Sequence, residues 1–112
     1  MAFTCLILLP PSTGAATDAI AIERVLGPEH PGGHYKHPAS LTELDNGDLL
    51  LSFYGGSGEY ATDTAVYAIR RREGSDTWTA PEVIADTPMV SEGNPVIWQA
   101  PDGWVWLFYV VR

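Results

Sequence analysis

Two short segments of the chain carry most of the side chains that could do acid–base chemistry. His34-Tyr35-Lys36-His37 combines two imidazoles, a phenol and an ammonium, and residues 59–63 hold two carboxylates and a second phenol. Carboxylates, imidazoles and phenols are the groups that proteins use as general acids and bases. The candidate catalytic residues are Glu59, Asp63, His37 and Tyr60, and the candidate substrate-binding residues are Lys36, Tyr35, His34 and Asn94.

Several of these candidates also have a structural interpretation. His37 could hydrogen-bond a neighbouring loop, Asp63 could steady the turn before the next strand, and Asn94 begins a turn-initiating Asn-Pro pair. Glu59, in a glycine-rich loop, is the strongest candidate for a catalytic acid. Four large aromatic residues are expected in the core or between packed sheets: Tyr54, Trp98, Trp104 and Trp106.

A β-hairpin is the element that must position these segments. Residues 37–56 read HPASLTELDNGDLLLSFYGG, in which Asn46-Gly47 separates two apolar runs. This dipeptide predicts a type I′ turn, because both central residues of that turn need a positive φ. Before the turn, alternate residues from Ala39 take one face of the strand and alternate residues from Ser40 take the other.

The same hairpin pattern recurs later in the chain. Residues 94–109 read NPVIWQAPDGWVWLFY, with an Asp-Gly turn in place of Asn-Gly. Subtracting residue numbers gives offsets of 57, 56 and 56 for three matched pairs: Pro38 with Pro95, Gly47 with Gly103, and Leu51 with Leu107. Chance similarity of two short hairpins is the alternative. A repeat slightly longer than 50 residues, with four strands per unit, is typical of a β-propeller blade.

The predicted architecture is all-β: a partial β-propeller with one complete four-stranded antiparallel blade and the first hairpin of a second. The strands are expected at residues 37–45, 48–54, 63–71, 77–85, 95–100 and 104–111, so blade one covers about 37–85 and the half blade about 94–112. The last apolar strand would leave an open edge, which is an aggregation hazard. We therefore expect residues 18–112 to be the N-terminal part of a larger propeller and to be poorly soluble alone.

The N-terminal segments differ in character. Residues 1–17 begin with the apolar run MAFTCLILL and are interpreted as a signal peptide or a disordered extension. An extracellular or periplasmic location is predicted on this basis, with the cytoplasm as the alternative. Residues 19–26 alternate enough to predict a strand, and residues 27–36 predict a loop because they are rich in glycine and proline.

Composition argues against several classes of function. The chain has 14 acidic and 6 basic residues and a net charge of −8, which disfavours nucleic acid and membrane surfaces as partners. Cys5 is the only cysteine and the sequence contains no HExxH motif, so we expect no intrachain disulfide, no metal and no cofactor. The run Arg70-Arg71-Arg72 is interpreted as a solvated strand end.

Taken together, these motifs resemble the sialidase-like superfamily of BNR or Asp-box repeat propellers, in particular the bacterial branch described as exo-α-sialidases. The resemblance covers about residues 37–112. The matching stretches are His37-Pro38-Ala39-Ser40-Leu41, Asn46-Gly47-Asp48-Leu49-Leu50, Gly55-Gly56, Asp63-Thr64-Ala65-Val66-Tyr67, Thr77-Trp78 with Pro81, Asn94-Pro95-Val96, Pro101-Asp102-Gly103 and Leu107-Phe108-Tyr109.

This resemblance implies roles for individual positions. Lys36 stands where family sialidases have an arginine that pairs with the substrate carboxylate, and Tyr60 is nearest to their acid–base aspartate, with Glu59 and Asp63 beside it. The Asp box keeps only its Thr-Trp pair, with Glu73 in place of the aspartate. The tyrosine nucleophile, its glutamate partner and two further arginines of the family would lie beyond the last residue.

The function implied is that of a carbohydrate-active enzyme, an exo-acting glycoside hydrolase that takes a glycan or oligosaccharide as substrate. Its structural partners would be the remaining propeller blades, and the 112-residue chain alone is expected to be inactive. One alternative is a polysaccharide lyase, in which His37 and Tyr60 move a proton and Lys36 neutralises a uronate. A non-catalytic glycan-binding or structural propeller is the other.

Overall fold

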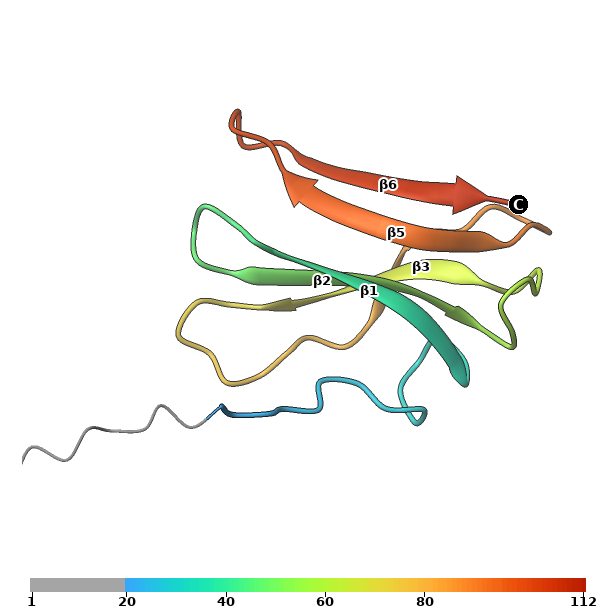
Figure 1. Cartoon of the computed structure of the whole chain (residues 1–112), viewed down its shortest axis with the longest axis horizontal. Coiled ribbons are helices and arrows are strands. Elements are labelled where there is room, and N and C mark those ends of the chain that lie inside the picture. The colour runs from blue at the N-terminus through green and yellow to red at the C-terminus, as the bar shows by residue number, and fades with distance from the viewer. Residues whose placement is uncertain (1–19) are drawn as a thin grey trace, which may run out of the picture.

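Six antiparallel strands form two sheets in the computed structural model, which describes residues 20–112 (Figure 1). The predicted signal peptide or extension at residues 1–17 lies outside the described residues. The first sheet has the order β1 (Tyr35–Glu43), β2 (Leu49–Gly56), β3 (Ala65–Arg71) and β4 (Glu82–Ala85). The second pairs β5 (Glu92–Gln99) with β6 (Val105–Val111). The all-β prediction of one four-stranded blade followed by a hairpin is confirmed.

Two predicted strands differ from the observed ones. The strand predicted at 77–85 is shortened to β4, because Trp78 makes only an isolated bridge with Arg71 and Pro81 lacks a backbone N–H. The described part of the predicted strand 19–26 is not a strand, and Ile20 and Ile22 are 92% and 93% exposed. An alternating sequence forms a strand only when it pairs with a neighbouring strand, and this segment pairs with none of the described strands.

The two hairpin turns have the same geometry, which differs from the predicted type I′ turn. Leu44 N donates to Asp48 O at 2.8 Å, and Gly47 N donates to Leu44 O at 2.8 Å. Gly47 has a φ of 81°, but Asn46 does not share a positive φ. This is a three-residue loop in which a type I turn is followed by a left-handed glycine. The second hairpin repeats both hydrogen bonds at Ala100, Trp104 and Gly103.

A β-bulge also occurs at the same place in both hairpins. In β1 the register shifts between His37, which pairs with Tyr54, and Ala39, which pairs with Phe53, so that Pro38 is the extra residue. In β5 the shift falls around Asn94-Pro95, where Asn94 has a φ of 49°. Because a proline cannot donate to the ladder, it fits at a bulge. The repeat found in the sequence is therefore a repeat of backbone structure.

The first sheet lies between the second sheet and the N-terminal segment (Figure 1). On the face that we call the inner face, β5 packs over β1 and β2, and Ile97 N donates to Ser40 Oγ at 3.2 Å. On the opposite, outer face, the Phe53 and Tyr67 rings stack with centroids 5.4 Å apart, and Gly32 lies against both rings. The core is formed chiefly by residues of the first sheet that these two layers cover.

Asp48, at the end of the first turn, ties that turn to the one between β3 and β4. Its carboxylate accepts hydrogen bonds from Glu73 N at 2.8 Å and from Arg70 Nε at 2.6 Å. The Glu73 N–H, followed by the Arg70 guanidinium, holds the pKa of Asp48 below its ordinary value. The arginine run is therefore not simply solvated, since Arg70 binds Asp48 and the Arg71 guanidinium lies 5.4 Å from the Trp78 ring centroid.

The aromatic residues expected in the core divide into two groups. Tyr54 is fully buried, as predicted. Trp98, Trp104 and Trp106 belong to the second hairpin and are 49%, 71% and 51% exposed. These three residues therefore lie outside the core of the described residues, and their predicted packing between blades stays a prediction.

Candidate functional site

Three connecting segments meet at the end of the first sheet where β1 begins and β2 ends. Gly33, in the segment before β1, lies directly against Gly56 at the end of β2. Thr64, at the end of the β2–β3 loop, donates its hydroxyl to Ser91 Oγ at 2.7 Å, just before β5. Ser91 Oγ in turn donates to Glu59 O at 3.2 Å. These contacts form one rim, which we call the site rim.

The site rim carries an aromatic triad formed by Tyr35, His37 and Tyr54. The ring centroids lie 6.2 Å apart for Tyr35 and His37, 5.9 Å for Tyr35 and Tyr54, and 6.2 Å for His37 and Tyr54. Alternation along β1 puts Tyr35 and His37 on one face, and the direct pairing of His37 with Tyr54 puts the third ring on the same face. His37 is exposed, whereas Tyr54 is fully buried.

Glu59 adds a carboxylate to this triad. The pKa of Tyr35 is raised to about 12, first by the neighbouring Tyr54 hydroxyl, then by burial and by the negative charge of Glu59. The Tyr54 hydroxyl nevertheless has no hydrogen-bond partner of good geometry among the described residues. Tyr35, His37, Tyr54 and Glu59 together are called the rim cluster below. It offers two phenols, an imidazole and a carboxylate at one place.

Asp63 has a structural part in the neighbouring loop. Its Oδ1 accepts hydrogen bonds from Ser57 N at 3.1 Å and Ser57 Oγ at 2.9 Å, which closes the loop. These bonds, the Ser57 N–H foremost, lower the pKa of Asp63 and keep it ionised at neutral pH. Tyr60 is 69% exposed, and the Arg112 guanidinium lies 4.9 Å from its ring centroid. Neither side chain belongs to the aromatic triad.

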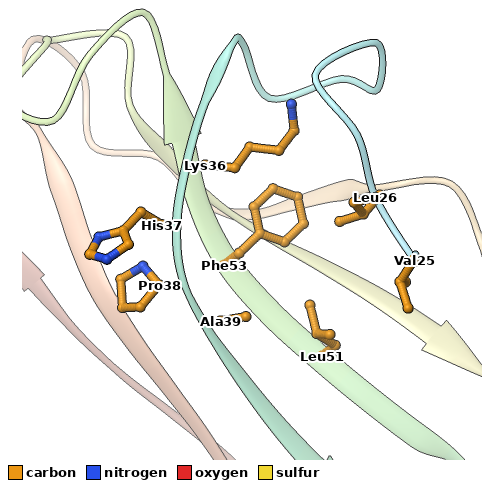
Figure 2. A pocket seen from close by; sticks show the side chains of 8 residues that line it. All are labelled: Val25, Leu26, Lys36, His37, Pro38, Ala39, Leu51 and Phe53. Atoms are coloured by element: carbon orange, nitrogen blue, oxygen red, sulfur yellow. The ribbon is translucent and has the colours of Figure 1, made fainter. Parts of the chain in front are cut away.

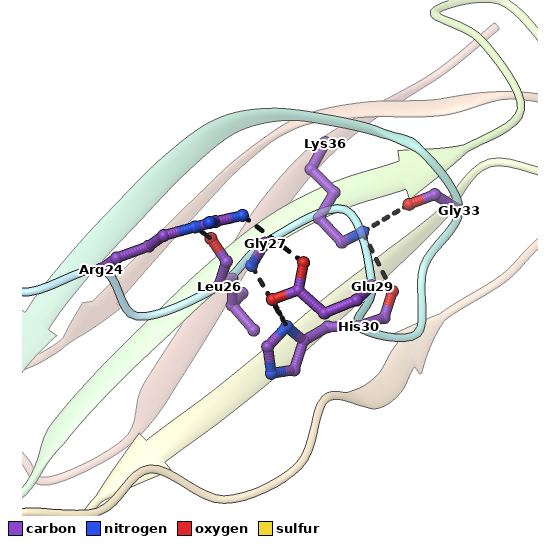
Figure 3. A network of polar contacts seen from close by, with 7 residues as sticks. All are labelled: Arg24, Leu26, Gly27, Glu29, His30, Gly33 and Lys36. Carbon is purple, nitrogen blue, oxygen red and sulfur yellow. Dashed lines mark hydrogen bonds and ion pairs between the residues drawn. The ribbon is translucent and has the colours of Figure 1, made fainter.

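Lys36 lies on the other side of the strand from His37. Its Nζ donates to the backbone oxygen of His30 at 3.1 Å and to that of Gly33, within a polar network that includes Glu29 (Figure 3). Figure 2 shows the Lys36 and His37 side chains directed to opposite sides of β1. Consecutive residues of a strand point to opposite faces, so the structure does not place the Lys36 ammonium beside the rim cluster.

A cavity of about 340 Å³ lies between the N-terminal segment and the outer face (Figure 2). Its lining is mostly aliphatic and aromatic: Val25, Leu26, Lys36, His37, Pro38, Ala39, Leu51 and Phe53. Glu59 is not part of it. The sequence-based prediction that His37 and Glu59 face one polar cavity is therefore not met by this cavity, although both side chains neighbour Tyr35.

The remaining candidates lie around the site rim. His34 is exposed in the segment before β1, and Asn94 is exposed in the β5 bulge. Glu92, which was expected on this rim without a catalytic or binding role, is fully buried at the start of β5. One of its carboxylate oxygens accepts Thr87 N at 2.6 Å, and the other has no partner among the described residues.

Sequence reasoning assigned Tyr54 to the core alone and missed its place in the rim cluster. The missing signal was the bulge at Pro38, which sets the register that pairs Tyr54 with His37. In the part of the chain that the structure describes, no group of three or more His, Cys, Asp or Glu side chains is arranged to hold a metal ion. Nor does any helix within residues 20–112 have the length and apolar character to cross a membrane.

The fold and the duplicated hairpin define a β-propeller type of repeat unit. Comparison with protein-family models matches residues 47–112 to the BNR repeat-like domain, and the chain belongs to this family. The match includes Glu59, Tyr60, Asp63 and Asn94 and begins after β1, which carries Tyr35 and His37. Neither a search of curated proteins nor a search of solved structures found a match.

Proposed function

We propose that this BNR repeat unit is part of a sialidase-like propeller that binds a glycan at the site rim and, in the assembled propeller, hydrolyses a terminal sugar. The observation that carries the proposal is the rim cluster, in which three aromatic rings lie within 6.2 Å of one another and the Glu59 carboxylate neighbours Tyr35. Aromatic rings supply apolar contact area, and carboxyl and phenol groups supply proton transfer.

In the proposed reaction, Glu59 is the general acid. Glycoside hydrolysis needs one group that protonates the leaving oxygen and a second that acts as nucleophile or base. Glu59 is exposed on the loop between β2 and β3 and can reach a bound ligand. Tyr35, with its pKa raised to about 12, stays protonated at neutral pH and acts as a hydrogen-bond donor to the sugar. We assign the second catalytic group to further blades, and the place of action to the extracellular space or periplasm.

A polysaccharide lyase is the second candidate, because the His37 and Tyr35 rings are neighbours 6.2 Å apart. An imidazole and a phenol can abstract a proton and return it. The lyase reaction also needs a cation that neutralises the uronate, and the Lys36 ammonium is bound to backbone oxygens on the other side of β1. Hydrolysis is therefore the first proposal. A lyase would release an unsaturated sugar that absorbs ultraviolet light.

Ligand-observed NMR on the 112-residue chain tests the binding step. The panel consists of sialosides, uronides and neutral pyranosides, and we expect saturation transfer to at least one class but no turnover. His37→Ala and Glu59→Gln should weaken this binding about tenfold or more. His30→Ala and Glu43→Gln are the matched controls, since they remove the same groups away from the site rim. Absence of binding to every class, or equal losses in the controls, would overturn the proposal.

A further inference from the structure

The loop that carries Glu59 is tied to the following repeat by two buried hydroxyl groups. Thr64, at the end of this loop, donates to Ser91 Oγ at 2.7 Å, and Ser91 Oγ donates to the backbone oxygen of Glu59 at 3.2 Å. Thr64 is fully buried and Ser91 is 3% exposed. We call this chain of two bonds the hydroxyl relay. It runs from the last residue before β3 to the last residue before β5, and from there back to Glu59.

The neighbouring hydrogen bonds fix the direction of the hydroxyl relay. A hydroxyl group has one hydrogen to donate. Ala61 O accepts the Thr64 N–H at 3.1 Å, so this oxygen keeps a donor when the Thr64 hydroxyl donates to Ser91. The Ser91 hydrogen then goes to Glu59 O, which is nearer than the alternative acceptor, Glu92 O, at 3.4 Å. Each hydroxyl therefore donates once, and the Ser91 hydroxyl that binds Glu59 is itself held by Thr64.

Ser91 is held more firmly than the tip of the Glu59 loop. The Ser91 backbone exchanges two hydrogen bonds with Arg112, at 3.1 and 2.9 Å. The loop tip, residues 58–61, has one hydrogen bond within it, at 3.3 Å, and Glu59 is exposed there. Among the described residues, the bond from Ser91 is the only hydrogen bond that joins this tip to the second repeat. The position of the tip relative to the second repeat therefore depends on the hydroxyl relay.

We propose that Thr64 and Ser91 are positioning residues that hold Glu59 in place to meet the ligand at the site rim. This inference rests on the proposed function, since it takes Glu59 as the general acid. A catalytic group acts efficiently only when its neighbours hold it in the productive geometry. Without the hydroxyl relay, the glycine-rich loop would be free to turn the Glu59 carboxylate away from Tyr35. The first repeat thus supplies the acid, and the second repeat sets its position.

The influence of Glu59 on the pKa of Tyr35 reports where the Glu59 carboxylate lies. In the wild type, Glu59→Gln should lower the pKa of Tyr35, because it removes a negative charge beside the phenol. Thr64→Val removes the hydroxyl with little change of shape, and in this background Glu59→Gln should have no effect on that pKa. Thr64→Ser keeps the hydroxyl and should keep the effect. Ultraviolet titration of tyrosinate in the 112-residue chain, without any ligand, measures all three pairs.

Thr77→Val is the matched control for Thr64→Val. Thr77 has a similar hydroxyl pairing, with Ser75 Oγ at 3.1 Å, but it lies in the connection at the other end of β3. This variant should leave the effect of Glu59→Gln as it is in the wild type. Ser91→Ala breaks the hydroxyl relay from the second repeat and should act like Thr64→Val. It takes the place of Thr64→Val if circular dichroism shows that Thr64→Val does not fold.

Three results of the titrations would overturn the inference. The first is an effect of Glu59→Gln that persists in Thr64→Val and in Ser91→Ala. The second is an equal loss of the effect in Thr77→Val, which would point to a general loosening of the fold. The third is no effect of Glu59→Gln in the wild type, since Glu59 would then not be held beside Tyr35.

Ligand binding distinguishes a failure of this inference from a failure of the proposed function. For the sugar class that gives saturation transfer with the wild type, Thr64→Val should weaken binding about tenfold, as Glu59→Gln does, and Thr64→Ser much less. A Thr64→Val chain that binds this sugar like the wild type would overturn the inference alone. If no sugar class binds, the proposed function fails, and the titrations still decide whether the hydroxyl relay positions Glu59.

Discussion

The hairpins β1–β2 and β5–β6 share a backbone but have opposite surfaces. Both have a left-handed glycine in a three-residue turn and a proline-containing bulge. Yet Leu41 is 57% exposed and its counterpart Ile97 only 6%, while Ser52 is fully buried and its counterpart Phe108 is 54% exposed. Turn and bulge residues fix the backbone of each hairpin locally. Which side chains are buried depends on the neighbouring sheet. Equivalent positions in the two hairpins therefore contribute differently to the stability of the described residues.

The largest expected difference between the two hairpins is in the free energy of unfolding lost when Ile97 or its counterpart Leu41 is replaced by alanine. Ile97→Ala should lower the free energy of unfolding by about 2–4 kcal/mol, because it leaves a cavity between the two sheets. Leu41→Ala should cost less than about 1 kcal/mol, since its side chain is mostly in water already. Urea denaturation of both variants beside the wild type measures the difference. Equal losses would mean that the second sheet does not depend on the first for its core.

The turns of the two hairpins should differ by a smaller amount, in how strongly their residues make stability depend on pH. Asp48 is 7% exposed and binds the Glu73 N–H and Arg70, whereas its counterpart Trp104 is 71% exposed. Since the folded-state pKa of Asp48 is lowered, its contribution to stability is present above the unfolded value near 4 and is lost as pH falls through the folded value. Asp48→Asn should therefore lower the stability at neutral pH and flatten its decline in acid.

The aspartate of the second turn supplies the control for this experiment. Asp102 accepts only the Trp104 N–H, at 3.2 Å, and its side chain is exposed. An asparagine can accept the same bond, so Asp102→Asn should leave the pH dependence of unfolding close to that of the wild type. If both variants change the acid limb of a stability–pH curve equally, Asp48 does not anchor the two turns as described.

The fold was predictable where local residues decide it. Asn46-Gly47 and Asp102-Gly103 gave the positions of both hairpins, since few other dipeptides suit a tight turn. The turn type was mispredicted because it depends on loop length and register, which the dipeptide alone does not determine. The strand predicted at 19–26 failed for a non-local reason, since an alternating pattern says nothing about whether a partner edge is present.

The candidate site was predictable only in part. The rim that gathers the loops follows from strand order, and Tyr35, His37 and Glu59 do lie together at it. Lys36 was misplaced because it was assigned to a loop, although β1 begins at Tyr35 and alternation then turns Lys36 away from His37. The place of Tyr54 in the rim cluster was not predicted, because it depends on the bulge at Pro38, whose exact position a single sequence does not reveal. The chemical roles of these residues stay predictions.

The smallest expected difference between the hairpins is in the pKa of a nearby tyrosine. Beside the bulge, His37 pairs with Tyr54 in the first hairpin. In the second hairpin, Gly93 pairs with Val110 at the corresponding place. Only the first pair can influence a titrating group, and the pKa of Tyr35 is raised to about 12 there. Tyr54→Phe should bring this pKa back toward its ordinary value near 10, and Glu59→Gln should do so to a lesser extent, because the Tyr54 hydroxyl is the larger cause.

Ultraviolet titration of tyrosinate, with Tyr35→Phe used to assign the step, measures these shifts. A raised folded-state pKa means that the unfolded chain loses its proton first as pH rises. The stability supplied by neutral Tyr35 is therefore complete below about pH 10 and is lost as pH rises through about 12. Tyr35→Phe should remove this alkaline loss. A Tyr35 that titrates near 10 in the wild type, or one that Tyr54→Phe leaves unchanged, would show that the two phenols and Glu59 do not act on one another. The first hairpin would then differ from the second in burial alone.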